Sequence, residues 1–149
     1  MSLPDSVYVA PVSLVAPMGS ILLVDDDDDS CALIALCLER EGWKVTQLSS
    51  LEAAQQALLI NPVTGACAFD VLLTDLHLRD GKGTELLAAG RPRGLAAALV
   101  LSGDVVEAES AQLHGFDGAL LKPFDRIALV GRIRELLSQP MPSGAHDVA

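Results

Sequence analysis

Aromatic residues are scarce in this chain of 149 residues: they make up 3% of it, whereas hydrophobic residues of all kinds make up 50%. The core must therefore be packed mainly by Leu, Val, Ile and Ala. Strands of a parallel sheet that is covered on both faces are nearly continuous aliphatic runs, so this composition favours helices packed on such a sheet. The length suits a single domain.

Basic residues are also few, since 10 Lys and Arg stand against 20 Asp and Glu and give a formal net charge of -10. A field of that sign repels polyanions, so we expect no direct binding to nucleic acid or to anionic membrane. Residues 1–19 are apolar but hold no Lys or Arg, which a secretory signal needs. No run reaches the roughly 20 apolar residues that span a bilayer. We expect a cytoplasmic protein.

Cysteine is sparse, and Cys31, Cys37 and Cys67 cannot all pair with one another within the chain. They also lack a CxxC metal spacing, so we expect free thiols in a reducing compartment. Prolines interrupt residues 1–19, and Pro, Ser and Gly recur after residue 138. We therefore divide the chain into a flexible N-terminal arm (1–19), a folded domain (20–138) and a flexible C-terminal tail (139–149).

Short aliphatic runs alternate with helical patterns beyond residue 20. The runs predict strands at 21–24, 43–48, 69–74, 95–101 and 118–121. Helices are predicted between them: one that ends near Gly42, then 51–60 capped by Ser50, about 84–89 and about 105–113. Asp125 is expected to cap a last helix, with Ile127, Val130, Ile133 and Leu137 facing inward. This alternation predicts an α/β fold with a doubly wound parallel sheet.

Isolated polar residues follow four of the predicted strands. Asp25 and Asp26 follow the first strand, Asp75 the third, Ser102 the fourth and Lys122 the fifth. The carboxyl ends of parallel strands meet at one edge of the sheet, where ligands bind beside the point at which strand order reverses. We therefore expect three carboxylates, one hydroxyl and one ammonium to form a single site.

Three crowded carboxylates repel one another, and Lys122 cancels only part of their charge. A hard divalent cation would cancel the rest, and Mg²⁺ prefers carboxylate, water and phosphate oxygens. With the cation present, Asp75 can attack phosphorus and form an aspartyl phosphate. Lys122 and the Ser102 hydroxyl can then bind the phosphoryl oxygens.

Four runs of the sequence resemble the receiver domain of two-component response regulators. They are ILLVDD from Ile21, DVLLTDLHLRDG from Asp70, LVLSG from Leu99 and LLKPF from Leu120. They stand in that family's order with comparable spacing, and the resemblance covers about residues 20–138. It implies a flavodoxin-like fold, a five-stranded parallel sheet of order 2-1-3-4-5 with helices on both faces.

The resemblance also implies a role for each matching residue near the acceptor. Asp75 would be the phospho-acceptor. Asp26 would bind Mg²⁺ directly, and Asp25 would bind it directly or through water. The backbone carbonyl of His77 would complete the protein ligands of the metal, while its side chain is expected to face solvent.

Ser102 would be the switch hydroxyl and Lys122 would pair with the phosphoryl group, with a cis peptide bond before Pro123. Two positions depart from the family pattern. Arg79 replaces a usual proline, which should loosen the loop after the acceptor. Ala119 replaces the usual Tyr or Phe, which in the family reports the position of the switch hydroxyl to the output surface.

The function implied is that of a phosphoprotein in a phosphorelay, which acts on no separate substrate. Its expected partners are a sensor histidine kinase or phosphotransfer protein and a downstream protein target, and a weak homodimer is allowed. One alternative is a phosphorylation-independent binding module, which Ala119 favours. Another is a phosphohydrolase with an Asp nucleophile. That chemistry would favour a second Asp where His77 stands, and a cap domain for which the chain has no room.

The acidic run Asp25–Asp29 has other interpretations. Its last three residues are most simply solvated charges near a helix N-terminus. A calcium-binding EF-hand is excluded, because Ser30 stands at the required Gly and Leu36 at the required bidentate Glu.

Overall fold

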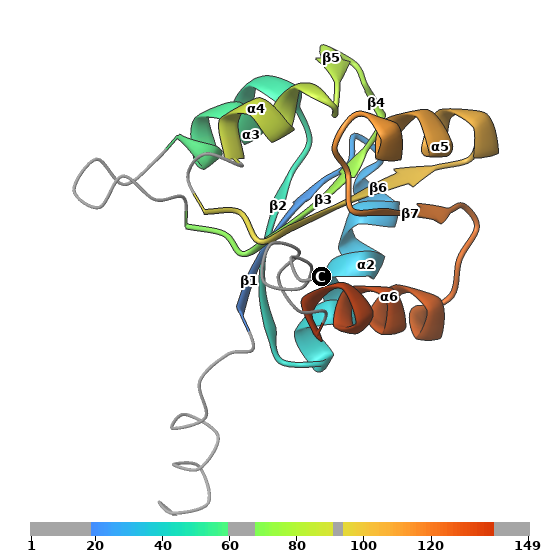
Figure 1. Cartoon of the computed structure of the whole chain (residues 1–149). Coiled ribbons are helices and arrows are strands. Elements are labelled where there is room, and N and C mark those ends of the chain that lie inside the picture. The colour runs from blue at the N-terminus through green and yellow to red at the C-terminus, as the bar shows by residue number, and fades with distance from the viewer. Residues whose placement is uncertain (1–18, 60–67, 91–93, 139–149) are drawn as a thin grey trace, which may run out of the picture.

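The computed structural model describes residues 19–59, 68–90 and 94–138. A five-stranded parallel sheet of order β2-β1-β3-β6-β7 forms its centre (Figure 1). With the five strands counted along the chain, this is order 2-1-3-4-5, which confirms the flavodoxin-like α/β fold. The strands are β1 (Gly19–Val24), β2 (Trp43–Leu48), β3 (Val71–Asp75), β6 (Ala97–Ser102) and β7 (Gly118–Leu121).

Helices cover both faces of the sheet (Figure 1). Alternate residues of each buried strand point to opposite faces, so Ile21 and Leu23 join one apolar cluster while Leu22 and Val24 join another. The first cluster packs under α2 (Asp28–Arg40) and α6 (Arg126–Ser138). The second packs under α3 (Leu51–Leu58), α4 (Glu85–Gly90) and α5 (Val105–Leu113). The core on both faces of the sheet is therefore filled mainly by aliphatic side chains, as the low aromatic content predicted.

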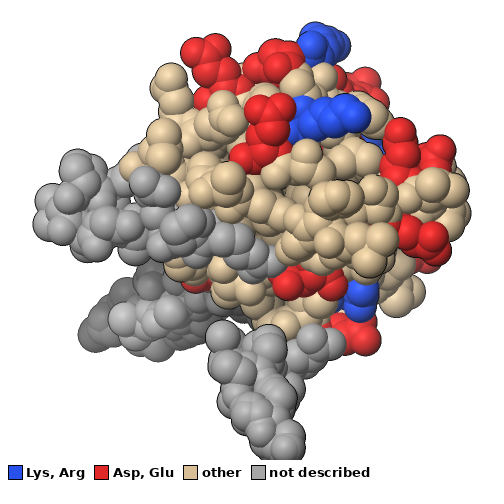
Figure 2. All heavy atoms as spheres, turned by 45° about the horizontal axis from the view of Figure 1, so that its top comes forward, with Lys and Arg blue, Asp and Glu red and all other residues tan. Residues whose placement is uncertain are grey.

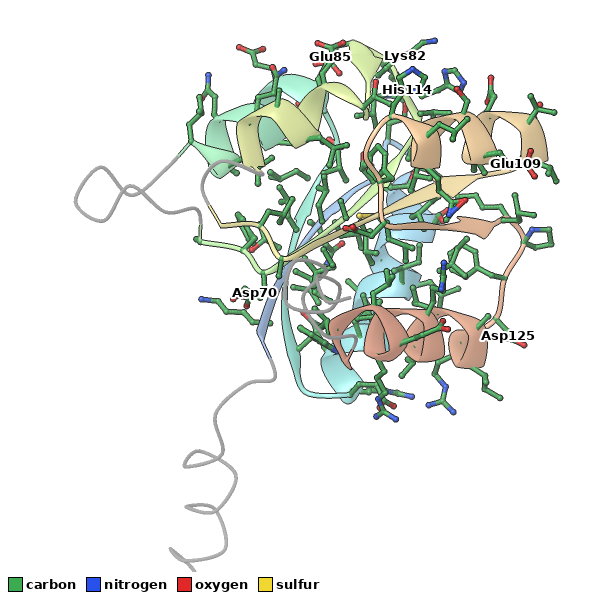
Figure 3. All side chains as sticks on the ribbon, in the orientation of Figure 1. Asp70, Lys82, Glu85, Glu109, His114 and Asp125 are labelled. Atoms are coloured by element: carbon green, nitrogen blue, oxygen red, sulfur yellow. The ribbon has the colours of Figure 1, made fainter. Side chains whose placement is uncertain are left out.

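Polar side chains cap the helices at their N-termini. The Ser50 hydroxyl accepts a hydrogen bond from the amide of Ala53, and the Asp125 carboxylate accepts one from the amide of Ala128. Both caps were predicted, and Asp125 is labelled at the start of α6 in Figure 3. At the other end of α2, the chain turns at Gly42, whose φ of 102° is accessible to glycine without strain.

Two features differ from the expectation. The segment after Asp75 contains a small antiparallel hairpin, β4 (His77–Leu78) and β5 (Gly81–Lys82), where a loop was expected. In α6, the buried residues are Leu129, Val130 and Ile133, while Ile127 is 76% exposed. Leu137 is 37% exposed as well, so the inward positions predicted for Ile127 and Leu137 were both wrong. The two residues lie near opposite ends of α6, and the buried residues lie between them.

Most of the predicted arm and all of the predicted tail (residues 1–18 and 139–149) lie outside the described residues, as does Cys67. Within the described ranges, Cys31 is a buried free thiol and Cys37 is a partly buried one. Burial raises the pKa of Cys31 to about 11, and the nearby Asp25 and Asp28 add to that effect. None of the described helices has the length and apolar character needed to cross a bilayer. Acidic side chains outnumber basic ones on the face shown in Figure 2.

Candidate functional site

The structure brings the polar strand-end residues together at one edge of the sheet. The Lys122 ammonium, just after β7, lies 2.7 Å from Asp75 Oδ1 at the end of β3. The same ammonium lies 3.5 Å from Asp25 Oδ2, just after β1. Ser102 ends β6 and lines the same hollow as Asp75 and Lys122. The expected constellation of residues is therefore present, drawn from four separate strand ends.

The acidic run after β1 divides into an inward and an outward part. Asp25 is fully buried, and its Oδ1 accepts a hydrogen bond of 2.9 Å from the amide of Asp27. Asp27 caps α2 by accepting from the amides of Asp29 and Ser30. Asp28 and Asp29 are exposed in the first turn, where negative charge is favourable. This turn directs Asp25 toward Asp75 and leaves the later residues solvated.

Asp25, Asp26 and Asp75 can each place one carboxylate oxygen within 4.8 Å of the others. The pKa of Asp75 is raised from 3.8 to about 7, first by burial and then by the neighbouring Asp25, while Lys122 opposes the rise. Burial alone would lower the pKa of Lys122, but its hydrogen bond to Asp75 and the charges of Asp75 and Asp25 raise it overall. The site therefore carries more negative charge than Lys122 balances, and its oxygen donors fit a hard divalent cation.

The segment after Asp75 is tied in place from both ends. The amide of Gly83 donates to the carbonyl of Leu76 at 2.8 Å, and a Cβ on Gly83 would overlap the carbonyl oxygen of Asp75. Asp80 accepts hydrogen bonds from the amides of Leu51 (2.8 Å) and Glu52 (3.1 Å) at the start of α3. These contacts anchor the segment that carries Arg79 between Asp75 and Gly83.

Arg79 adds a cation that the sequence did not associate with the site. Its Nε lies 4.0 Å from Asp26 Oδ2, and its Nη2 donates to the backbone carbonyl of Asp26 at 3.5 Å. The Arg79 side chain is 84% exposed, so the pair is screened by water. Arg79 therefore adds positive charge on the open side of Asp26.

A hollow of about 260 Å³ opens beside the Asp75 carboxylate. Ser102 is buried in its wall, with its Oγ accepting from the amide of Asp104 at 3.0 Å. His77 and Glu107 also line the hollow, and His77 Nε2 lies 2.9 Å from Glu107 Oε1. The His77 side chain is exposed, as expected. Its contact with Glu107 was not predicted, because no local pattern links two residues 30 positions apart.

The remaining predicted features lie close to the site. The peptide bond between Lys122 and Pro123 is cis, as expected. Ala119 is half-buried in β7 and packs against the cluster beneath α3, α4 and α5. It does not line the hollow beside Asp75. No aromatic ring stands at this position of β7 to follow a movement of Ser102.

The chain belongs to the response regulator receiver domain family, whose pattern it matches over residues 21–134. It is 32% identical over 130 residues to the transcriptional regulatory protein FixJ of Azorhizobium caulinodans, a match that covers 85% of this chain and 59% of FixJ. It spans 55–59% of the length of the first three curated relatives that it matches. Those relatives are transcriptional or photosynthetic-apparatus regulators.

Solved structures agree with this family. A putative response regulator from Chloroflexus aurantiacus is 29% identical, with a TM-score of 0.70 over 83% of this chain and 99% of the other. The receiver domain of sensor histidine kinase PA1611 from Pseudomonas aeruginosa, 20% identical, shares the fold with a TM-score of 0.68 over 81% of this chain and 98% of the other. That structure has a magnesium ion coordinated in its active site cleft.

Proposed function

We propose that Asp75 receives a phosphoryl group from a sensor histidine kinase or phosphotransfer protein and that the phosphorylated chain binds a downstream protein differently. The folded receiver unit would span residues 20–138, with the cation held by Asp25, Asp26, Asp75 and the backbone carbonyl of His77. The observation that carries the proposal is the placement of Asp75: a carboxylate in a hollow, 2.7 Å from the Lys122 ammonium and beside two further carboxylates.

The residues present suit Mg²⁺. Bound there, the ion would neutralise excess carboxylate charge and the charge on the incoming phosphoryl oxygens. The raised pKa of Asp75 supports this assignment, because burial and then the neighbouring Asp25 disfavour its charged form, and Lys122 offsets them only in part. The magnesium ion in the Pseudomonas receiver domain supports the choice of metal by analogy of fold.

In the transfer step, an Asp75 carboxylate oxygen attacks phosphorus as the bond from phosphorus to the donor atom breaks, and the donor leaves with that electron pair. Lys122 is already beside Asp75 and would pair with a phosphoryl oxygen. The Ser102 hydroxyl would have to leave the carbonyl of Asp104, to which it now donates at 3.3 Å, to donate to another phosphoryl oxygen. The chain would act on no separate substrate.

Small phosphodonors test the assignment without a cognate kinase. Incubation with phosphoramidate or acetyl phosphate and Mg²⁺ should add the mass of one phosphoryl group, read on the intact protein, and hydroxylamine should remove it. Asp75→Asn should gain no such mass. Asp29→Asn is the matched control, because Asp29 belongs to the same acidic run but is exposed, and it should label like the wild type. Equal labelling of Asp75→Asn would remove Asp75 from the central role.

A further inference from the structure

A hollow of about 240 Å³, here called the α6 hollow, lies along α6 and shares no residue with the hollow beside Asp75. Five of its lining residues recur at spacings of three or four along α6 and so form one stripe of that helix. Val130 is buried beneath the hollow, whereas Ile127 is largely exposed beside it. The lining residues are Glu41, Arg126, Ile127, Val130, Gly131 and Arg134.

Two arginines of this stripe share one carboxylate. Arg134 Nη2 donates to Glu41 Oε1 at 2.7 Å, and Arg126 Nη1 lies 3.5 Å from Glu41 Oε2. Glu41 is the C-cap residue of α2, where its amide donates to the carbonyl of Leu38 at 3.0 Å, so its backbone is held in place. Guanidinium groups stay protonated in proteins. Two cations and one carboxylate therefore leave a surplus of positive charge at the α6 hollow.

The other carboxylates near this helix are bound elsewhere. Asp125 Oδ1 accepts a hydrogen bond from the amide of Ala128 at the start of α6, and Glu135 Oε1 accepts one of 2.7 Å from Arg132 Nη1. Neither acidic residue lines the α6 hollow. The formal net charge of the chain is -10, so an acidic group is repelled by the molecule as a whole. The local surplus at the α6 hollow attracts it instead.

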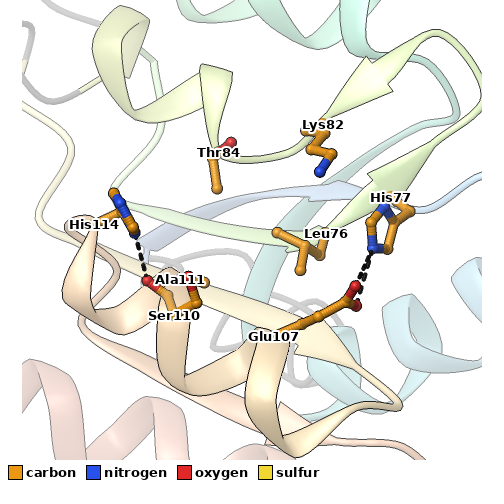
Figure 4. Close-up of a pocket in the computed structure, with 8 residues that line it drawn as sticks. All are labelled: Leu76, His77, Lys82, Thr84, Glu107, Ser110, Ala111 and His114. Carbon is orange, nitrogen blue, oxygen red and sulfur yellow. Dashed lines mark hydrogen bonds and ion pairs between the residues drawn. The ribbon is translucent and has the colours of Figure 1, made fainter.

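The larger hollow between the β4–β5 hairpin and α5 carries no such surplus in its lining. It measures about 450 Å³, and its charged side chains are Lys82 and Glu107 (Figure 4). Their charges are opposite, so the lining is neutral when His77 and His114 are neutral. The α6 hollow is therefore distinguished by its charge and not by its size.

Gly131 keeps the α6 hollow open in the middle of the helix. Glycine in a helix interior is less favourable than alanine. A Cβ at position 131 would meet nothing within 4 Å, so packing within this chain does not require glycine there. The missing side chain leaves room for another molecule to approach the helix closely.

We propose that the α6 hollow is a docking surface for an acidic segment of a partner protein. A carboxylate of that segment pairs with Arg126 and Arg134, and a neighbouring apolar side chain packs against Ile127. Each guanidinium has five N–H donors, so a second carboxylate can be bound while Glu41 stays in place. A second copy of this chain fits less well, because a two-fold dimer through this face would oppose two surpluses of positive charge.

Selection from random peptides displayed on phage tests this inference. The library is depleted on the double variant Arg126→Ala, Arg134→Ala and then selected on the wild type. Enriched peptides are synthesised and their binding is measured by fluorescence anisotropy. They should combine acidic with apolar residues and should bind more weakly as salt is added. Arg134→Ala should weaken their binding about threefold or more, the scale of one exposed ion pair.

Two further variants separate the shape of the hollow from the overall charge of the protein. Gly131→Leu fills the hollow and changes no charge, and it should weaken binding by about tenfold because the added side chain excludes the partner. Lys82→Ala removes one cation from the hollow in Figure 4 and should leave binding unchanged. Circular dichroism on each variant checks that the fold is kept.

Four results would overturn the inference. They are the enrichment of no peptide, the enrichment of peptides without acidic residues, equal weakening by Lys82→Ala and Arg134→Ala, and unchanged binding to Gly131→Leu. Self-association of the wild type in sedimentation that Arg134→Ala abolishes, with no peptide enriched, would assign the hollow to a second copy instead. All these measurements use unphosphorylated protein, so a failure of the proposed function at Asp75 would leave them unaffected.

Discussion

Replacing Asp75 with Asn should stabilise the metal-free protein at neutral and alkaline pH. The pKa of Asp75 is raised from 3.8 to about 7, chiefly by burial and then by Asp25. Between those two pH values the native state keeps a proton that the unfolded chain releases. Stability must therefore fall as pH rises through this window, since the native state binds more protons there. Asn resembles the neutral acid and avoids that loss.

The expected gain in the stability of Asp75→Asn follows from the difference between the native and unfolded pKa values of Asp75. Each pH unit between the native and unfolded pKa values corresponds to about 1.4 kcal/mol, so the upper limit above pH 7 is about 4 kcal/mol. Loss of the ion pair between Asp75 and Lys122 reduces the gain, and we expect about 1–3 kcal/mol near pH 8. Near pH 4 the variant and the wild type should have similar stability, because both then carry a neutral side chain at position 75.

Asp80→Asn provides a control whose effect on the free energy of unfolding should have the opposite sign. The amides of Leu51 and Glu52 lower the pKa of its carboxyl, so Asp80 contributes stability that is present above the unfolded pKa and is lost as pH falls through the folded one. Asp80→Asn should therefore destabilise the protein near neutral pH, and its effect should shrink as the pH is lowered into the acidic range. Urea unfolding with a metal chelator, across the range from about pH 4 to pH 8, measures both variants. An Asp75→Asn protein that is less stable than the wild type at the alkaline end would refute the reasoning.

Three further predictions concern the metal and the loop. Mg²⁺ should stabilise the wild type by about 2.7 kcal/mol at a hundredfold excess over its dissociation constant, whereas Asp26→Asn should show a much smaller shift in melting temperature. Gly83→Ala should destabilise the fold by about 1–3 kcal/mol, because the added Cβ would overlap the carbonyl oxygen of Asp75. Gly103 has open space around it, so Gly103→Ala should have little effect when both variants are compared by urea unfolding. Arg79→Ala should tighten Mg²⁺ binding by less than about tenfold in calorimetry, because it removes one exposed cation from beside Asp26; weaker binding would contradict its assigned place.

The strands and the gathering of the site could be predicted from sequence because both depend on simple regularities. Aliphatic runs such as 21–24 and 118–121 mark strands, and parallel order then places Asp25, Asp75 and Lys122 at one edge. Each of these steps uses only the period of a pattern or the end of an element.

Contacts between side chains of separate loops could not be predicted in this way. The Asp80 carboxylate accepts from the amide of Leu51, 29 positions earlier in the chain. His77 forms a hydrogen bond with Glu107, 30 positions later. No local pattern marks either partner, since the choice depends on how two segments approach after the sheet has formed. The same holds for Ile127, whose burial depends on which part of α6 meets the sheet.

Because the site is built from separate strand ends, metal binding can report whether the sheet has formed. Asp25 and Lys122 are 97 residues apart in the chain and meet only when β1, β3 and β7 lie in their native order. The carboxylates of the cluster follow β1 and β3, so a partly unfolded chain in which these two strands had separated would no longer present it. Because such a site rarely exists in an unfolded chain, the fraction of protein that binds Mg²⁺ would report the fraction in which β1 and β3 are paired. The cation would then serve as a folding indicator that needs no attached dye or added aromatic residue.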